Sequence, residues 1–577
     1  MAQAVRRRAA LVDPRLAPHR DVLGRALNLE FAVAARWRPE VVVTGSDPDA
    51  YHRGRVKAHR AGGDLIMIVD GPLSLEGAGL PASFWPVLVD HQRLFECDNP
   101  AQAGAEALNR LPQNPEETEA VQSSWRAWTP DPVWWRPQAE IASASSRDLL
   151  ELLSGGDVEK LSEQAFWRAV FARIGDASPP DDLLSRFLAS LIWLDPYDRK
   201  PVTMDGAMTI LKLIEAHWRA NKRPAHCFGA QYWNHPSINA TFSGAGGPVA
   251  FHETAETAVM AADETGGTVL GWAGRTTPEI EAECEGRNVP LIRIEDGFLR
   301  SVGLGAGLAR GAMLAVDDLG IYYDPSRPSR LERLLETYDL SASEEARGAA
   351  LIDKIIAARV SKYNFGRDAA LSFPEERHVL LVPGQVADDA AIRKSMSATI
   401  DCAATPNVNL DLLKLARERN PDAYIVYKPH PDVETGLRKG RIAKEDALRL
   451  ADDIAESANI IDVIDACDAV ETFSSLSGFE ALLRGKKATV HGLPFYAGWG
   501  LSTDLTLCAR RTRRRTLPEL VYLSLVVYAR TIDPVTLLPC SPEFLIDRLA
   551  AQRADRKHVL ITTLKRQASW LGRKLGI

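Results

Sequence analysis

The sequence of 577 residues lacks the features that define several large protein classes. It has no uncharged apolar run of about 18 residues, so we expect no membrane-spanning helix. Its seven cysteines form no CxxC pair, which argues against a zinc site or a disulfide framework and favours the cytoplasm. A net charge of −7 argues against a general nucleic-acid binder. At about 100–200 residues per domain, the length predicts three or four domains.

What the sequence does contain, from about residue 248 to 500, is an alternation of short apolar runs and helix-like segments. The predicted strands are Thr268–Gly271, Leu291–Ile294, His378–Val382, Ala423–Tyr427, Ala469–Thr472 and Ala488–His491. The predicted helices include Pro278–Gly286, Leu331–Tyr338, Asn409–Arg419 and Gly478–Arg484. This order predicts the α/β class, with parallel sheets in two Rossmann-like lobes that divide near residues 363–376. Ligands of such sheets bind where the strands end.

Three segments of the amino-terminal half resemble later ones. Asp64–Leu80 is similar to Pro290–Ala306, Phe84–Pro100 to Gly311–Pro325, and Leu194–Pro201 to Ile532–Pro539. The offset grows from 226 residues between Asp70 and Asp296 to 338 between Asp195 and Asp533, so the first copy is shorter by about 112 residues. We interpret residues 1–240 as a truncated, degenerate copy of the module that follows. Chance similarity of short α/β segments is the alternative.

The first candidate site follows a predicted strand and consists of Glu295, Asp296 and Arg300. Adjacent carboxylates with an arginine are typical of a nucleophile or base with a charge partner. A structural ion pair beside a turn fits these residues equally well. In the first copy, Asp70 corresponds to Asp296, whereas Glu295 and Arg300 have no counterpart.

Two further motifs follow consecutive strands of the second lobe. Lys428 and His430 are flanked by prolines, which fix the backbone and suit an anionic phosphate. Ser474 and Ser475 are expected near a helix N-cap, where backbone N–H groups attract phosphate, with Glu480 farther along that helix. An ordinary serine N-cap is the alternative. Together the two motifs predict a nucleotide-phosphate site, although no Walker lysine and no GxGxxG sequence are present.

Weaker signals surround these motifs. Tyr496 and Trp499 lie in a glycine-containing loop and would stack on sugar rings or fill the space between the lobes. Gln385 belongs to another loop at a strand end. The carboxylates at Asp317 and Asp318 are more typical of turn caps than of a metal site, and we predict no metal.

With these motifs the chain resembles the KpsC/LipB-type capsule polysaccharide proteins, over about residues 248–545. Six motifs occur in that family's order: EDGFLRSVGLG (295–305), DDLGIYYD (317–324), LVPGQVADD (381–389), YKPHPDVETG (427–436), SSLSGFEALLRG (474–485) and HGLPFYAGWGL (491–501). The resemblance implies a GT-B-like pair of lobes. Residues 248–370 would form the lobe for the nucleophile and acceptor, and residues 376–505 the lobe for the nucleotide. Residues 506–577 would form a helical segment.

The activity implied by the resemblance is the transfer, with retention, of 3-deoxy-D-manno-oct-2-ulosonic acid (Kdo) from CMP-Kdo to a phosphatidylglycerol-type lipid or Kdo-lipid acceptor. Asp296 would be the nucleophile, supported by Glu295 and Arg300. Five residues would hold CMP: Lys428, His430, Ser474, Ser475 and Gln385. Glu480 would bond its ribose. Tyr496 and Trp499 would line the sugar and acceptor cleft. No cofactor is implied.

The resemblance further implies a cytoplasmic protein at the inner membrane, with an anionic membrane surface and other capsule assembly proteins as partners. Residues 1–240 lack a second KPHP loop and a second SSLSGFE segment, so we expect that part to be non-catalytic. The basic tail 555–577 would lie on a membrane or form a solvated helix. Two other functions stay open: an inactive sugar- or lipid-binding scaffold, and a nucleotide-sugar epimerase that prefers UDP.

Overall fold

The computed structural model describes most of the chain and divides it into two units. The described residues are 8–31, 39–71, 83–111, 123, 125, 148–149, 152, 157–162, 165–174, 181–301, 310–362, 371–402, 404–434, 436 and 438–555. The units are Met1–Ala220 and Asn221–Ile577. The structure therefore divides the chain before the predicted residue 240, because Ala225–Phe228 already forms a strand of the second unit. The basic tail from residue 556 lies outside the described residues.

The first unit is built on one mixed sheet of seven strands in the order β2-β1-β3-β4-β5-β6-β7. The strands are β1 (Arg8–Val12), β2 (Leu29–Phe31), β3 (Val41–Gly45), β4 (Asp64–Asp70), β5 (Ser83–Val89), β6 (Ile192–Leu194) and β7 (Pro201–Val202). Its helices include α1 (Arg20–Ala26), α2 (Pro48–Ala61), α3 (Pro100–Asn109), α6 (Phe166–Ile174), α7 (Asp181–Ser190) and α8 (Met204–Ala220). Strands β2, β1, β3 and β4 are parallel, whereas β5 and β6 run antiparallel to their neighbours. Asp70 is the last residue of β4.

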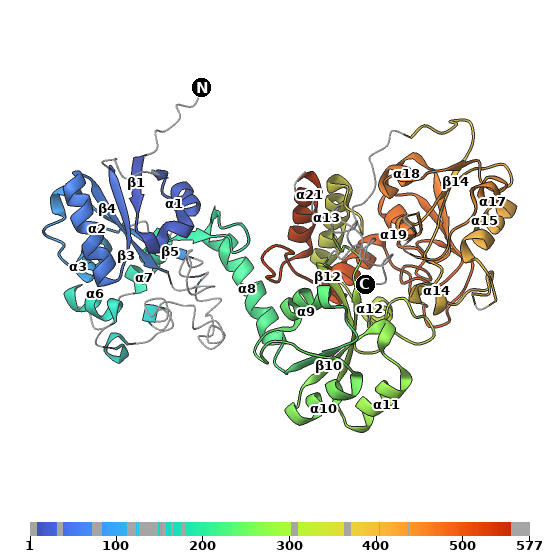
Figure 1. The fold of residues 1–577 in the computed structure, drawn as a ribbon, viewed down its shortest axis with the longest axis horizontal. Helices are drawn as coiled ribbons and strands as arrows, with labels where there is room; N and C mark the ends of the chain where they lie inside the picture. Colours follow the sequence, from blue (N-terminus) through green and yellow to red (C-terminus); the bar gives the residue numbers. More distant parts are fainter. Residues whose placement is uncertain are drawn as a thin grey trace. The chain divides into compact units, whose positions relative to one another are not determined.

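The second unit contains two six-stranded sheets, which define its two lobes (Figure 1). In the N-lobe (residues 221–362 and 517–555) the sheet order is β19-β12-β11-β10-β8-β9. These strands are β8 (Ala225–Phe228), β9 (Ala250–His252), β10 (Thr268–Trp272), β11 (Leu291–Asp296), β12 (Met313–Asp317) and β19 (Ala529–Thr531). The helices are α9 (His235–Phe242), α10 (Ala255–Thr265), α11 (Pro278–Gly286), α12 (Arg330–Thr337) and α13 (Ala342–Ala358).

In the C-lobe (residues 371–516) all six strands are parallel, in the order β15-β14-β13-β16-β17-β18. They are β13 (Val379–Pro383), β14 (Tyr424–Lys428), β15 (Asp453–Ile454), β16 (Ala469–Thr472), β17 (Lys487–Val490) and β18 (Thr503–Asp504). Six helices lie between them: α14 (Ala390–Arg393), α15 (Val408–Arg419), α16 (Pro431–Glu434), α17 (Lys444–Leu448), α18 (Ile460–Ala466) and α19 (Leu476–Leu483).

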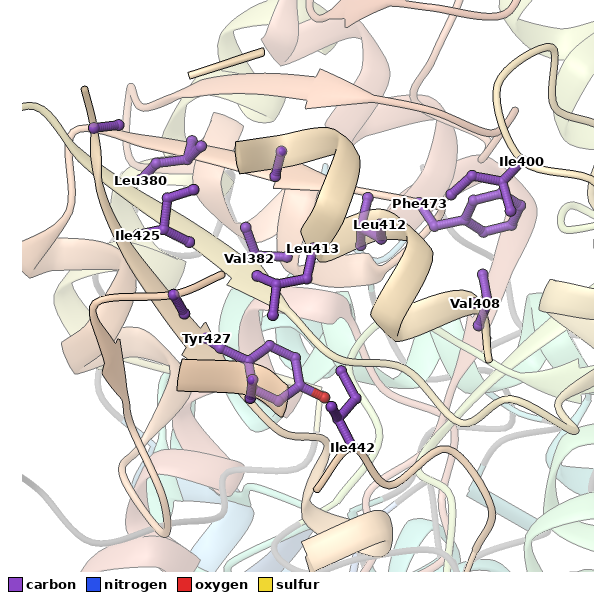
Figure 2. Packing of buried hydrophobic residues seen from close by; sticks show 14 of the residues in the cluster. Leu380, Val382, Ile400, Val408, Leu412, Leu413, Ile425, Tyr427, Ile442 and Phe473 are labelled. Carbon is purple, nitrogen blue, oxygen red and sulfur yellow. The ribbon is translucent and has the colours of Figure 1, made fainter. Parts of the chain in front are cut away.

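The C-lobe sheet is buried on both faces, which explains its apolar strands. Figure 2 shows one face, where Leu412 and Leu413 of α15 pack beside Val382 and Ile425 of the sheet. Asn407 caps this helix by accepting a hydrogen bond from Asn409 N. The packing holds the ends of β13 and β14, and with them the loops that follow.

The segment after β18 leads back to the N-lobe. Arg511 bonds Glu332 of α12 with Nε (3.0 Å) and the carbonyls of Pro494 and Ala497 with Nη1 (2.7 Å each), so the basic run 510–515 joins the lobes. The chain then forms α20 (Leu517–Tyr522), the π-helix η8 (Leu523–Tyr528), strand β19 and α21 (Pro542–Ala554). None of the helices in the described part of the chain is long and apolar enough to span a membrane.

The structure confirms the α/β class and places every predicted strand and helix within two residues of its expected ends. It differs in two respects. The N-lobe sheet is mixed, because β12 and β19 run antiparallel to their neighbours. The carboxyl-terminal segment is not purely helical, because β19 joins that sheet; a three-residue strand is too short to show a period in sequence.

Candidate active site

A cavity of about 1210 Å³, counted to its open mouth, lies between the N-lobe and the C-lobe. The N-lobe contributes Tyr322, Tyr323, Ser361 and Lys362. The C-lobe contributes the loops after β13, β14, β16 and β17, as expected for ligand sites at strand ends. Together with Tyr496 of the predicted sugar and acceptor cleft, these loops and helix α19 bring all six predicted donor-binding residues to the cavity: Gln385, Lys428, His430, Ser474, Ser475 and Glu480.

Asp296 ends β11 and forms an ion pair with Arg300, whose Nε lies 2.6 Å from Asp296 Oδ2. The arginine side chain is only 1% exposed, so the pair is shielded from water on the arginine side. The other carboxylate oxygen, Oδ1, is buried and has no hydrogen-bond partner among the described residues. A Cβ at Gly311 would lie 2.9 Å from Oδ1, so glycine leaves room beside that oxygen. Oδ2 is thus held by Arg300, whereas Oδ1 accepts no hydrogen bond from the described residues.

Glu295 precedes Asp296 at the end of β11, and its Oε1 accepts a hydrogen bond from Asp296 N at 3.1 Å. Burial, followed by the charge of Asp296, raises the pKa of Glu295 to about 8. Glu295 therefore holds its proton at neutral pH, which limits the pair of carboxylates to one negative charge. Glu295, Asp296 and Arg300 are not among the described residues of the cavity wall. The link to the wall is Tyr322, whose hydroxyl donates to Asp296 O at 3.2 Å.

The loop after β14 fixes His430. Asp432 N donates to His430 Nδ1 at 3.1 Å, so in the neutral ring Nε2 carries the proton. Burial, with the charges of Lys362, Lys428 and Arg438, lowers the pKa of His430 to about 3. Gly384 allows this loop to approach β13, because a Cβ there would lie 2.7 Å from the Tyr427 hydroxyl. His430 is thus a neutral N–H donor rather than a cation.

Lys428 lies deeper, with its side chain 3% exposed. Its Nζ is 3.4 Å from Ala455 O and 3.9 Å from Glu434 Oε2. Burial lowers the pKa of Lys428. Lys428 therefore lines the cavity from a fixed position, where burial disfavours its charged form and Glu434 favours it.

The two serines of the third motif have different surroundings. Ser475 is the N-cap of α19 and accepts a hydrogen bond from Ser477 N, which confirms the predicted cap. Ser474 N donates to Gln385 Oε1 at 3.0 Å, whereas Ser474 Oγ is buried with no partner in the described part of the chain. Gln385 is held in turn by Asn409. The start of α19 is thus fixed, while one hydroxyl remains available.

Sequence reasoning missed Lys362, which connects the two lobes. Its N–H donates to Glu480 Oε1 at 3.1 Å, and its carbonyl accepts from Arg300 N (3.1 Å) and Ser301 N (3.3 Å). Glu480 is buried, and burial raises its pKa. Glu480 therefore lines the cavity, but its Oε1 already accepts a hydrogen bond from Lys362 N and is not wholly free to bind a ribose. No motif surrounds Lys362 in sequence, so only the fold identifies it.

The aromatic loop needs a correction. Trp499 is fully buried, donates from Nε1 to Phe495 O at 2.8 Å and is not among the cavity-lining residues, so it is a packing residue rather than a cleft residue. Tyr496 does line the cavity, with its hydroxyl donating to Ser475 O at 2.5 Å. That bond requires Gly478, where a Cβ would lie 2.2 Å from the hydroxyl.

Aromatic packing also joins the first and last motifs. The ring centroids of Phe298 and Phe495 lie 4.5 Å apart, which ties the loop after β11 in the N-lobe to the C-lobe. Asp317, by contrast, serves as a turn cap: its Oδ1 accepts from Leu319 N and Gly320 N, and its Oδ2 from the Tyr528 hydroxyl.

The chain matches a protein family within its second unit and individual proteins over about two thirds of its length. Residues 268–349 and 338–533 match the family described as capsule polysaccharide biosynthesis protein. The capsule polysaccharide modification proteins LipA of Neisseria meningitidis serogroup A (strain Z2491) and serogroup B (strain MC58) are 36% identical over 385 residues and 38% identical over 383 residues. These alignments cover 66% and 65% of this chain and 53% of each LipA, so the chain spans about half the length of these relatives.

A solved structure, titled Thermosulfurimonas dismutans KpsC, beta Kdo 2,4 transferase, is 32% identical, with a TM-score of 0.49 over 57% of this chain and 98% of that chain. The family match and the LipA relatives agree with the six motifs and their order. The chain therefore belongs to the KpsC/LipB-type capsule polysaccharide proteins.

Proposed function

We propose that this protein is a glycosyltransferase of capsule polysaccharide synthesis that transfers Kdo from CMP-Kdo, with retention, to a lipid or Kdo-lipid acceptor. The observation that carries the proposal is the anchored Asp296 carboxylate beside a cavity equipped for a phosphate. Family membership and the six motifs direct it to Kdo.

The donor phosphate would lie between the neutral Nε2–H of His430, the buried Lys428 ammonium, Ser474 Oγ and the start of α19. These groups supply hydrogen-bond donors and positive charge where the phosphate of CMP gains charge as it leaves. They are fixed before the ligand arrives: His430 by Asp432 N, and Ser474 by Gln385. Glu480 would meet the ribose by exchanging or sharing its bond from Lys362 N.

Asp296 Oδ1 would attack the anomeric carbon of Kdo, forming the carbon–oxygen bond to the protein as the bond to the CMP phosphate breaks. An acceptor hydroxyl would then displace Asp296 from the same carbon. Two inversions give net retention. Arg300 holds Oδ2 through both steps, and neutral Glu295 keeps a second negative charge away from the nucleophile.

We further propose that the first unit is a truncated, non-catalytic copy of this module. Its strands β1-β3-β4-β5-β6 have the same order and relative directions as β8-β10-β11-β12-β19. The turns after β6 and β19 also agree: Asp195 N donates to Lys200 O and Asp533 N to Leu538 O, both at 2.8 Å. Arg199 and Leu537 have φ angles of 53° and 61°.

Thermal-shift titration with CMP and UDP tests the proposed function. We expect CMP to raise the melting temperature and UDP to have little effect, because the proposed donor is a CMP-sugar. His430→Gln should weaken the CMP effect, whereas His378→Gln, an exposed histidine at the start of β13, should leave it unchanged. Stabilisation by UDP alone would reject CMP-Kdo as the donor and favour an epimerase.

A further inference from the structure

A cluster at one edge of the N-lobe sheet has no role in the chemistry above. Strands β8, β10 and β11 are adjacent and parallel, so their carboxyl ends lie at the same edge. Asp296 ends β11 at that edge. The turn after β8 carries Tyr232 and Trp233, and the turn after β10 carries Arg275. At about 4.8 Å between neighbouring strands, the end of β8 lies roughly 10 Å from that of β11.

The two turns touch each other at Gly229. This glycine has a φ angle of 76°, and a Cβ there would lie 2.8 Å from Arg275 Cβ and 3.6 Å from Trp272 Cβ. The stem of Arg275 therefore packs directly against the backbone that leads into Tyr232. This contact places Arg275 next to the turn that carries the aromatic pair, at the edge where β11 ends.

Tyr232 and Arg275 at this edge are exposed to solvent, and Trp233 is half-buried. Tyr232 is 69% exposed, and its ring centroid lies 5.2 Å from that of Trp233, edge to face. The Tyr232 ring buries little area and so has little packing function of its own. Buried beneath it, Asn234 Oδ1 has no hydrogen-bond partner among the described residues.

Arg275 differs from the other arginines of these strands and helices. It is exposed and has neither an ion pair nor a hydrogen bond within the described ranges. By contrast, Arg293 of β11 pairs with Glu281 at 2.7 Å, and Arg287 after α11 pairs with Asp263 at 3.0 Å. The positive charge of Arg275 is thus not neutralised, and its turn lies at the sheet edge where Asp296 ends β11.

We propose that Tyr232, Trp233 and Arg275 form an acceptor subsite for a carboxylated sugar. Aromatic faces stack on the C–H faces of pyranose rings, and a guanidinium binds a carboxylate through paired, charge-assisted hydrogen bonds. The neighbouring position on β11 brings a hydroxyl of that sugar toward Asp296. This inference rests on the proposed function and adds the chemical class and the location of the acceptor.

Initial-rate kinetics with CMP-Kdo and a synthetic Kdo glycoside of varied concentration test the subsite in the full chain. Tyr232→Ala and Arg275→Gln should each raise the KM for the acceptor by about tenfold and leave the KM for CMP-Kdo unchanged. Arg287→Gln is the matched control and should change neither constant. The methyl ester of the same glycoside removes the acceptor charge, so Arg275→Gln should no longer affect its KM.

Three results would overturn the subsite: an unchanged acceptor KM in both variants, an equal rise in the KM for CMP-Kdo, or the same effect of Arg275→Gln on acid and ester. Failure of the wild-type protein to transfer Kdo at all would count against the proposed function instead. In that case saturation-transfer NMR of the Kdo glycoside reads the subsite directly. Signals lost in Arg275→Gln support it, and signals equal to wild type reject it.

Discussion

Arg300 Nε and Asp296 Oδ2 lie 2.6 Å apart, and the second oxygen of the same carboxylate has no partner in the described part of the chain. The two residues are four positions apart in sequence, at and just after the end of β11, so the ion pair is local and does not depend on closure of the lobes. A carboxylate held at one oxygen has a fixed orientation, which favours attack by the other.

Replacing Asp296 tests this role of the carboxylate. Asp296→Asn should abolish Kdo transfer, because the amide is a poor nucleophile, while CMP affinity stays within about twofold of wild type. Transfer is measured by product formation and affinity by calorimetry.

The matched control is Asp70→Asn, since Asp70 ends β4 of the first unit as Asp296 ends β11. We expect full activity from this control. Transfer at the wild-type rate by Asp296→Asn would rule out the carboxylate as nucleophile.

Glu295 should make stability depend on pH. Its pKa is raised from 4.5 to about 8, so between these values the folded protein holds a proton that the unfolded chain has lost. The free energy of unfolding should therefore fall as the pH rises from about 5 to 8. Glu295→Gln cannot ionise and should show a shallower decline in urea denaturation.

Glu285→Gln, an exposed position on α11, serves as the comparison and should keep the wild-type slope. A Glu295→Gln slope identical to that of wild type would show that Glu295 is ionised in the folded protein at neutral pH.

The adjacent serines should separate stability from binding. Ser475→Ala removes the N-cap of α19 and should cost about 1 kcal/mol of unfolding free energy. Ser474→Ala removes a buried hydroxyl without a partner and should cost less than that, yet lower CMP affinity by about tenfold. Denaturation and calorimetry on both variants make the comparison. The reverse pattern, with Ser474→Ala the less stable and CMP affinity intact, would remove Ser474 from the phosphate site.

Trp499 should behave as a core residue. Trp499→Ala should lower the free energy of unfolding by about 3–5 kcal/mol, because the ring is fully buried and its Nε1 bonds Phe495 O. CMP affinity of the folded protein should change little. If Trp499→Ala kept the wild-type stability and instead showed a large rise in the KM for a substrate, Trp499 would be a residue of the cleft.

Much of the site could be predicted because its residues follow strands with clear apolar patterns. The runs that became β13, β14 and β16 mark Gln385, His430 and Ser474 directly, since side chains at the ends of parallel strands meet at one edge. The N-cap at Ser475 is a local signal and was equally visible.

Other features depend on contacts between distant segments. Lys362 bonds both Arg300 and Glu480 through its backbone, which no side-chain motif reveals. Trp499 and Tyr496 lie in the same aromatic loop and are both fully buried, and only the folded structure shows that Tyr496 lines the cavity whereas Trp499 does not. Strand β19 lies more than 200 residues from its partner β12, and its three residues follow no pattern.

The central claim is that this chain transfers Kdo from CMP-Kdo through Asp296. Incubation with CMP-Kdo and a synthetic Kdo-lipid, followed by NMR of the product linkage, tests it most directly. The account predicts a new β-linked Kdo from the wild-type protein and none from Asp296→Asn. Intact CMP-Kdo and unmodified acceptor with the wild-type protein, or an α-linked product, would contradict it.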